Sequence, residues 1–146
     1  MRLTLHTDYA LRLLMLLALE PEDTHTVEEV ARRYGISHNH MNKVVQTLAQ
    51  EGFVESMRGR GGGVRLARAP GKINIGAVVR ATEDNFDIVE CFNAKRNTCI
   101  ATPACGMRGP LQEALAAFLG VLDRYTLADL MGSAAAMKRM RRLLGA

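Results

Sequence analysis

Two short helix signals joined by a glycine constrain the fold of this chain more than any other feature of its sequence. Thr26 can cap the first helix and Glu29 stands three residues later, a spacing typical of a capping box. Gly35 allows a tight turn, and Ser37 can cap a second helix over residues 38–50. The pattern predicts a helix-turn-helix, whose second helix is suited to the major groove of DNA.

The helix expected over residues 38–50 has an apolar side and a polar side. The apolar side has the 3–4 spacing of a buried face and consists of Met41, Val44, Val45 and Leu48. The polar side carries groups that can hydrogen-bond base edges and phosphates, namely His38, Asn39, His40, Asn42, Lys43 and Gln46. We expect this side to bind DNA, and a merely solvated helix face is the alternative.

A glycine-rich hairpin is expected next, because two β-type runs over residues 52–57 and 64–67 flank a tip with Arg58 and Arg60. A flexible solvent loop would explain the glycines but not the arginines. Beside a helix-turn-helix the hairpin is expected to be a wing, with Arg60 in the minor groove and Arg58 on phosphate. Residues 30–72 hold eight Lys or Arg and two acids, and this net charge of +6 suits a phosphate backbone.

The start of the chain predicts another helix, over residues 6–20, with Thr7 as its cap. The spacing of its apolar residues predicts a buried face made of Leu11, Leu14, Met15, Ala18 and Leu19. Asp8 lies in the first turn, where a carboxylate favours the helix dipole. A shorter helix is expected over residues 75–81, leading out of the DNA-binding unit.

All three cysteines of the chain, Cys91, Cys99 and Cys105, lie in one short segment. Pro103 and Gly106 disfavour a helix there, so a loop is expected. Three thiolates on one loop favour a metal ion or an iron-sulfur cluster, and their spacing is wider than in structural zinc knuckles. Three buried free cysteines, or a disulfide with one free thiol, are the alternatives. A reducing cytosol disfavours the disulfide.

The last third of the chain is expected to form a long helix, with Pro110 at its first position and its end at Tyr125. Its apolar residues alternate steps of four and three, the spacing of a helix-helix seam, at Leu111, Leu115, Phe118, Leu122 and Tyr125. We expect the seam to pack against a second copy of the chain, and one side of a monomeric core is the alternative. Thr126 can cap one further turn, over residues 127–131.

These elements predict a mainly α chain of 146 residues with a small β-hairpin wing. The expected parts are a winged helix-turn-helix DNA-binding domain (1–72), a connecting helix and cysteine loop (73–109), a dimerisation helix with its following turn (110–131), and a frayed or disordered basic tail (132–146). The sequence has no apolar run long enough for a membrane span and no evident secretory leader, so we expect a cytoplasmic protein.

Three stretches resemble one bacterial winged-helix family and together cover the chain up to Met131. They are LHTDYALRLLMLLA, GISHNHMNKVVQTLAQEGFVESMRGRGGGVRLA, and EDNFDIVEC through CIATPACGMRGPLQEALAAFLGVLDRYTLADL. The family includes nitric-oxide-sensing repressors and regulators of iron-sulfur biogenesis. The resemblance implies a homodimeric transcriptional repressor that holds an iron-sulfur cluster, responds to nitric oxide and binds a palindromic operator in double-stranded DNA.

The same resemblance implies a set of cluster ligands. Cys91, Cys99 and Cys105 would hold a cluster, [4Fe-4S] in the first place and [2Fe-2S] as the alternative. Asp8 of the other subunit would be the fourth ligand, and Arg12, one turn beyond it, could orient that carboxylate through an ion pair. No histidine follows Cys105 closely, which argues against the branch of iron-sulfur biogenesis regulators.

Other functions remain open at this point. An iron-status or redox sensor would share the fold. An electron-transfer protein would share the cluster, but it would not need a basic helix-turn-helix. An enzyme is not expected, because no histidine lies near the three cysteines in sequence to act as a general base.

Overall fold

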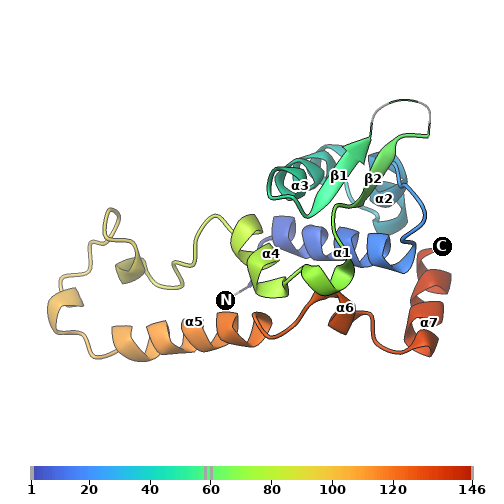
Figure 1. The fold of residues 1–146 in the computed structure, drawn as a ribbon. Coiled ribbons are helices and arrows are strands. Elements are labelled where there is room, and N and C mark those ends of the chain that lie inside the picture. Colours follow the sequence, from blue (N-terminus) through green and yellow to red (C-terminus); the bar gives the residue numbers. More distant parts are fainter. Residues whose placement is uncertain (1, 58, 60, 146) are drawn as a thin grey trace.

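The computed structural model describes residues 2–57, 59 and 61–145, and α1 (Leu5–Leu19) lies at the centre of its larger part (Figure 1). The helix begins after Thr4, whose side chain accepts a hydrogen bond from the Thr7 backbone N–H at 3.3 Å. The prediction that Thr7 caps the helix is therefore wrong. A cap needs the extended backbone that Thr4 has, whereas Thr7 is already helical and buried.

Buried residues occupy more of the α1 surface than the sequence pattern predicted. The fully buried apolar positions are Ala10, Leu13, Leu14, Leu16, Leu17 and Leu19. Leu11, Met15 and Ala18 are only partly buried, so the predicted face is correct only for Leu14 and Leu19. The reason is that α3, α4, α6 and a strand of the hairpin contact the helix from several sides (Figure 1).

The predicted helix-turn-helix is confirmed. Its first helix, α2 (Val27–Tyr34), begins at Thr26, whose hydroxyl accepts a hydrogen bond from the Glu29 backbone N–H at 3.1 Å. The Glu29 carboxylate accepts a hydrogen bond from Arg33 at 2.6 Å, and this ion pair replaces the second half of the expected capping box. Gly35 ends the helix with a φ of 63°, in the left-handed region that favours glycine.

The second helix of the motif, α3 (His38–Gln50), has the bounds that the sequence predicts. Ser37 caps it by accepting a hydrogen bond from the His40 backbone N–H at 3.2 Å. All four residues of the predicted buried face are buried, namely Met41, Val44, Val45 and Leu48. The helix therefore packs on the body with its apolar side and leaves its polar side outward.

The predicted hairpin consists of β1 (Val54–Met57) and β2 (Gly63–Leu66), paired antiparallel with Val54 opposite Leu66. Its expected DNA contacts, Arg58 and Arg60, lie outside the described residues. Two backbone hydrogen bonds between His25 and Val64, of 3.2 and 2.8 Å, join β2 to the loop before α2. The hairpin is thus attached to the body of the molecule through β2.

Residues beyond the expected DNA-binding domain complete the core. The turn η1 (Pro70–Lys72) leads into α4 (Ile75–Thr82), and α6 (Leu127–Leu130) returns to the same side of the body. Ile73, Val78 and Leu127 are fully buried in the core that surrounds α1. We call this packed unit, which comprises α1 to α4, the hairpin and α6, the body.

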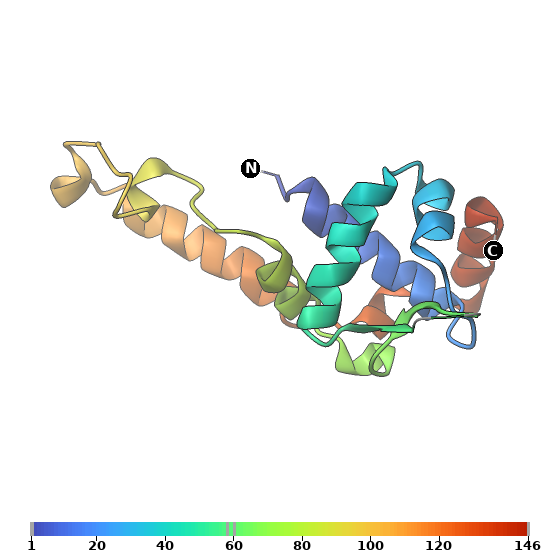
Figure 2. The ribbon, with the colours of Figure 1, turned by 90° about the horizontal axis from the view of Figure 1, so that it is seen from above.

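The segment from residue 84 to the end of α5 (Arg108–Leu122) projects away from the body (Figures 1 and 2). It includes the turns η2 (Glu90–Phe92) and η3 (Thr102–Ala104), and we call it the arm. The expected start of α5 at Pro110 is wrong by two residues, and its expected end at Tyr125 is wrong by three, because a turn follows Leu122. Proline is compatible with any position of a first helical turn, because the backbone N–H groups there have no intrahelical acceptor.

The C-terminal segment is an ordered helix, so the expected frayed or disordered tail is wrong. In α7 (Ala134–Leu144), Ser133 caps the start by accepting a hydrogen bond from the Ala136 backbone N–H at 3.3 Å. Gly145 ends the helix with a φ of 65°. None of the helices that the structure describes is long and apolar enough to cross a membrane.

Candidate functional site

The outward face of α3 presents four of the predicted DNA-binding residues to solvent. His38, Asn39, Asn42 and Lys43 are exposed, while the opposite, buried side of the helix packs on the body. The Asn42 side-chain amide lies 3.1 Å from the His38 Nδ1, and this contact orders both side chains along the helix. Amide, imidazole and ammonium groups on one rigid face can hydrogen-bond base edges and phosphates.

His40, the fifth predicted residue of this helix, has a different environment. Its ring is partly buried and packs edge-on against Tyr9 of α1, with ring centroids 4.8 Å apart. The His6 ring also stacks on the His40 ring, with ring centroids 6.1 Å apart, and His6 Nε2 lies 3.1 Å from the Thr47 hydroxyl. Burial, and then the nearby His40, lower the pKa of His6. His40 therefore joins α3 to α1 and is less available to DNA than its neighbours.

Two other arginines of the hairpin region form contacts within the chain. Arg65 on β2 pairs with Glu55 on β1 across the strands, and both side chains are about half exposed. Arg68 donates hydrogen bonds to the Gly52 carbonyl at 3.0 and 2.6 Å, and its guanidinium lies 5.2 Å from the centre of the Phe53 ring. Part of the positive charge predicted for DNA therefore stabilises the base of the hairpin.

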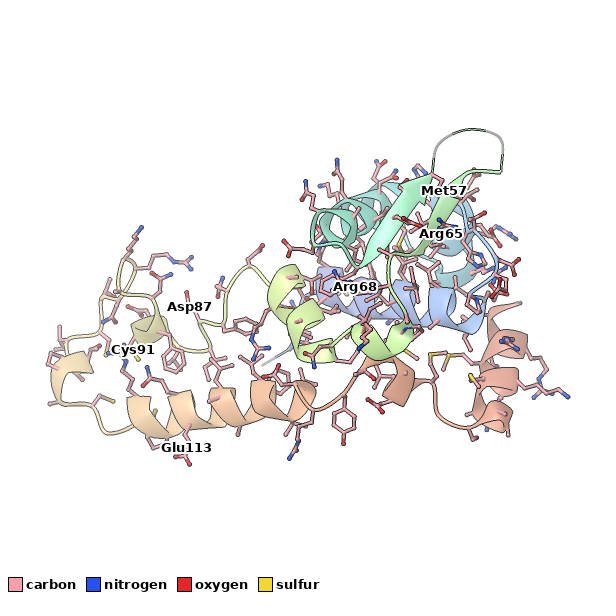
Figure 3. The ribbon with its side chains drawn as sticks, in the orientation of Figure 1. Met57, Arg65, Arg68, Asp87, Cys91 and Glu113 are labelled. Atoms are coloured by element: carbon pink, nitrogen blue, oxygen red, sulfur yellow. The ribbon has the colours of Figure 1, made fainter. Side chains whose placement is uncertain are left out.

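The three cysteines lie on the arm, where each is a free thiol. Cys91 lies in η2 and is partly buried. Figure 3 shows it on the arm, far from Arg65 of the hairpin. Cys99 and Cys105 are exposed. These positions contradict the two alternatives drawn from the sequence, since there is no disulfide among the described cysteines and two of the three are not buried.

Polar contacts shape the cysteine segment. The Glu90 carboxylate accepts hydrogen bonds from the Thr98 backbone N–H and from the Thr98 hydroxyl, the latter at 2.7 Å. These bonds lower the pKa of Glu90. We call this pair of hydrogen bonds the Glu90–Thr98 clasp. Because Cys91 follows Glu90 and Cys99 follows Thr98, the clasp holds the first two cysteines at the ends of one closed loop.

A second set of contacts continues this order toward the third cysteine. The Thr102 hydroxyl donates to the Cys99 carbonyl at 2.9 Å and accepts from the Asn97 amide at 2.9 Å. Within the part of the chain that the structure describes, no three Cys, His, Asp or Glu side chains are gathered closely enough to hold a metal ion. The donor set fits a cluster in its chemistry, because all three thiols are free and belong to one segment without a core of its own.

Asp8 and Arg12 form the predicted ion pair on α1. An Asp8 carboxylate oxygen lies 2.6 Å from Arg12 Nη2, and the other accepts a hydrogen bond from Nε at 3.1 Å. Both side chains are more than one-third exposed, so the carboxylate is fixed in orientation and open to a partner. The Tyr34 hydroxyl donates to the Arg12 carbonyl at 3.0 Å, which ties this turn of α1 to α2.

A joint between the arm and the body was missed by the sequence reasoning. Arg80 on α4 binds Asp123, the residue after α5, through two hydrogen bonds of 2.5 and 2.8 Å. Asn74 caps α4 and also donates to the Asp123 carbonyl at 2.7 Å. A Cβ at Gly76 would lie 1.9 Å from the Asp123 Oδ1, so only glycine leaves room for this contact.

Electrostatics favour the ionised joint. The hydrogen bonds from Arg80 hold the pKa of Asp123 below its ordinary value, and those to Asp123 raise the pKa of Arg80. The signal in the sequence was limited to an asparagine at a helix start and an acid after a long helix. Neither residue type indicates a partner about 50 positions away.

The fold and the exposed polar helix define a winged helix-turn-helix regulator of transcription. The model of the Rrf2 family, described as "Iron-dependent Transcriptional regulator", matches residues 3–133, and the chain belongs to this family. Known relatives agree with this assignment. The chain is 55% identical over 132 residues to "HTH-type transcriptional regulator NsrR" of Halalkalibacterium halodurans, covering 90% of each chain. It is 54% identical to the protein of that name in Bacillus subtilis, over 90% of each chain.

Solved structures give the same fold. "T. potens IscR" superposes with a TM-score of 0.71 at 25% identity, over 90% of this chain and 86% of that one. The oxidised form of Staphylococcus aureus CymR gives a TM-score of 0.74 at 21% identity, over 92% and 98% of the two chains. The resemblance found in the sequence and the expected winged-helix architecture are therefore confirmed. The names of the relatives also confirm that the chain is a regulator and not an enzyme.

Proposed function

We propose that the chain is a homodimeric repressor that senses nitric oxide through a [4Fe-4S] cluster and releases operator DNA when the cluster reacts. The observation that carries the proposal is the placement of three free thiols on one exposed arm, joined to a winged-helix body, in a chain 55% identical to an NsrR protein. A role in transcription supports a cytoplasmic location for the protein.

Cys91, Cys99 and Cys105 would hold the cluster, and Asp8 of the other subunit would complete its ligands. The hydrogen bonds between Glu90 and Thr98 close the loop between the first two cysteines, which supports this segment as a ligand loop. When bound, the cluster supplies iron atoms that react with nitric oxide. Asp8 is supported as a ligand by its exposure and by Arg12, which fixes the direction of its carboxylate.

Dimerisation through α5 is supported by apolar side chains that the single chain leaves uncovered. Leu111, Leu115, Phe118 and Leu122 are only partly buried, and Tyr125 is 45% exposed. A long helix without a buried residue gains little from hydrophobic burial on its own. A second copy packed along this seam would bury the row and would set two recognition helices at a fixed spacing, as a palindromic operator requires.

On DNA, the exposed residues of α3 would enter the major groove: His38, Asn39, Asn42 and Lys43, with His40 at the edge of this face. Arg60 is proposed for the minor groove and Arg58 for a phosphate. The close approach of Gly63 to the His25 backbone, next to the tip, supports a hairpin held in a fixed direction. The joint at Asp123 would pass a change in the arm to α4 and so to α1 and α3, which α4 contacts.

An iron-status or redox sensor of the same fold is the second candidate. The observation that favours it is the family description, which names iron and not nitric oxide. Both functions use the same thiols and the same DNA-binding face. They differ only in the chemistry that the cluster undergoes.

Anaerobic purification followed by titration tests the proposal. Absorbance would be recorded during addition of nitric oxide, and separately of oxygen, beside gel shifts with operator DNA. We expect added nitric oxide to bleach the chromophore and to release DNA together. Release by oxygen or by iron removal, with no response to nitric oxide, would favour the second candidate.

A further inference from the structure

His25 is a buried histidine whose side chain has no role in the contacts described above. The residue is 3% exposed, and it lies between the end of α1 and Thr26, which caps α2. Neither ring nitrogen is aligned for a hydrogen bond with any residue that the structure describes. A buried polar group without a hydrogen bond costs free energy, so the ring needs another source of stabilisation.

Two carboxylates face the ring from two helices. Glu20 Oε2, at the end of α1, lies 3.1 Å from His25 Nε2, and Glu29 Oε1, on α2, lies 3.6 Å from Nδ1. A neutral imidazole has one N–H, so its bare nitrogen would face an oxygen that also accepts. An imidazolium has an N–H on both nitrogens and a positive charge that attracts both carboxylates, and this attraction does not need an aligned hydrogen bond. The geometry therefore suits the charged ring.

The charges around the ring support the same protonation state. Arg33 on α2 binds both carboxylates, at 3.0 Å to Glu20 and at 2.6 Å to Glu29. We call Glu20, His25, Glu29 and Arg33 the charge cluster, and their side chains are between 4% and 29% exposed. With a neutral His25 the cluster has one unbalanced negative charge, whereas an imidazolium makes it neutral. Burial reduces screening by water and salt, so this balance affects stability.

Charged side chains on the neighbouring segments are exposed or bound to other groups. Glu22 and Asp23, in the same loop, are exposed. Arg65 of β2 pairs with Glu55, and Arg141 of α7 binds the carbonyl of the last residue of α1. Within the described part of the chain, the proton on the ring is therefore what balances the charge cluster.

The backbone of the same loop holds the wing. His25 exchanges two hydrogen bonds with Val64 of β2, and a Cβ at Gly63 would lie 2.8 Å from the His25 carbonyl oxygen. Glycine is therefore required for this close approach. The Thr24 hydroxyl also donates to the Gly61 carbonyl at 3.2 Å, beyond the end of β2. Residues 24 and 25 thus connect the charge cluster to the hairpin.

We propose that His25 positions the wing on DNA, and that its protonated form holds the hairpin in the orientation that operator binding requires. The proposal rests on the DNA-binding function above. Histidine is the side chain whose charge ordinarily changes between pH 5 and pH 8. Loss of the proton would leave an unbalanced negative charge beside a buried ring, so residues 24 and 25 would hold the hairpin less firmly. Operator affinity is therefore high while His25 is charged and falls as pH rises.

The test measures operator affinity at pH 6 and at pH 8, by fluorescence anisotropy at constant salt, with full-length protein isolated without oxygen. The parent protein is compared with His25→Gln, which has no titratable group at this position. Between the two pH values the parent should lose about fivefold or more affinity beyond any change in His25→Gln, the lower end of typical coupling between two sites. His38 and His40 are present in both proteins, so the difference between the two profiles reports His25.

Glu29→Gln and Glu28→Gln are a matched pair of variants. In Glu29→Gln the remaining Glu20 and Arg33 balance each other without a proton on the ring, so the pH effect that depends on His25 should disappear. Glu28 is exposed, so Glu28→Gln removes the same charge from the next position and should keep the parent profile. The Glu29 side chain is 29% exposed, so its amide variant should fold, and urea unfolding at both pH values checks this.

A probe on the wing tests the proposal without DNA. The Val64 backbone N–H donates to the His25 carbonyl at 2.8 Å, so its NMR chemical shift should change between pH 6 and pH 8 in the parent and not in His25→Gln. Random-sequence duplex is measured beside the operator. A parent protein that prefers the operator at neither pH would count against the proposed function, whereas the Val64 signal would still test His25.

Overlapping pH profiles of operator affinity in the parent and in His25→Gln would overturn the proposal. A full pH effect in Glu29→Gln would do the same, because the charge cluster would then not be its source. So would a change in the Val64 signal that persists in His25→Gln, since another group would then control the wing.

Discussion

The body and the arm of this chain differ in how much of their apolar surface is buried. In the body, α1 is surrounded on most sides, and six of its apolar residues are fully buried. In the arm, from residue 84 to the end of α5, every residue is described and none is buried. The two regions meet where Asp123 binds Arg80 and Asn74, and where Leu122 at the end of α5 packs against the core.

This difference indicates which region can be stable alone. The body buries enough apolar surface to offset the conformational entropy of its helices, whereas the arm is held by hydrogen bonds such as Glu90–Thr98 that also compete with water. In the proposed function, a second copy of the chain would cover the apolar row of α5, and the cysteines would hold a cluster. A region with low intrinsic stability can change shape when its ligand changes, which suits a sensor.

The largest effect is expected for a cysteine of the arm. Cys99→Ala removes one of three thiolates, so the anaerobically isolated protein should lose the cluster chromophore completely. The body should unfold at an unchanged denaturant midpoint when compared with apo parent protein, because Cys99 is exposed. Cys105→Ala should behave in the same way. A Cys99→Ala protein with a full chromophore would remove this residue from the ligand set.

Leucine truncation separates the two regions by stability. Leu48→Ala in α3 should lower the free energy of unfolding by about 2–5 kcal/mol, since this side chain is fully buried. Leu115→Ala in α5 should leave unfolding of dilute monomer nearly unchanged but shift dissociation of the dimer to higher protein concentration. Urea titrations and sedimentation equilibrium provide the two readouts. Equal losses in both assays would show that the arm is part of the same core.

Asp8→Ala should have a smaller effect than loss of a cysteine. Three thiolates remain, so the chromophore should persist but decay faster in air, and its reaction with nitric oxide should change. Asp8→Asn is the matched variant, because it keeps the size of the side chain and removes the charge that pairs with Arg12. Cluster stability, nitric oxide reaction and DNA binding all equal to the parent would restrict Asp8 to a role at the helix start.

The joint can be broken and restored by charge. Arg80→Asp should bring the operator affinities of the cluster-loaded and apo proteins closer together, because α4 would no longer be bound to Asp123 at the end of the arm. The double variant Arg80→Asp/Asp123→Arg should recover part of the difference between the two affinities. The control Arg124→Ala removes a neighbouring exposed cation and should leave that difference unchanged. Coupling that survives in Arg80→Asp would show that the arm acts through another contact.

Acid should weaken the same joint, with the smallest effect of the set. The pKa of Asp123 is lower in the folded protein than the ordinary 3.8, so its contribution is fully present above that value and is lost as pH falls through the lower folded pKa. Near neutral pH the joint should therefore be insensitive to pH. Chemical shifts of the Arg80 side chain between pH 6 and pH 2 report the change, and Asp123→Asn should abolish it.

Local signals explain how much could be predicted. The helix-turn-helix was predictable because Thr26, Gly35 and Ser37 determine helix ends within a few residues of their own position. The helix α7 carries signals of the same kind, Ser133 and Gly145, and a frayed or disordered tail was expected because these two capping residues were missed. Ser133 and Gly145 are therefore as informative as the residues that determined α2 and α3.

Long-range packing could not be predicted in this way. The burial of α1 depends on α4 and α6, which contact it from distant parts of the chain, so a single 3–4 pattern gave only part of its buried face. The bond between Arg80 and Asp123 spans 43 residues. The thiols of the site were evident from the sequence, whereas the Glu90–Thr98 clasp that closes their loop depends on a backbone path that residue types do not specify.

The most direct test of the account is the operator affinity of one protein sample before and after cluster removal, at a single salt concentration and without oxygen. The account predicts that the cluster-loaded dimer binds at least about tenfold more tightly, a difference of about 1.4 kcal/mol. Nitric oxide should reproduce the affinity of the apo protein. Equal binding by the loaded and apo forms would contradict the claim that the arm controls the body.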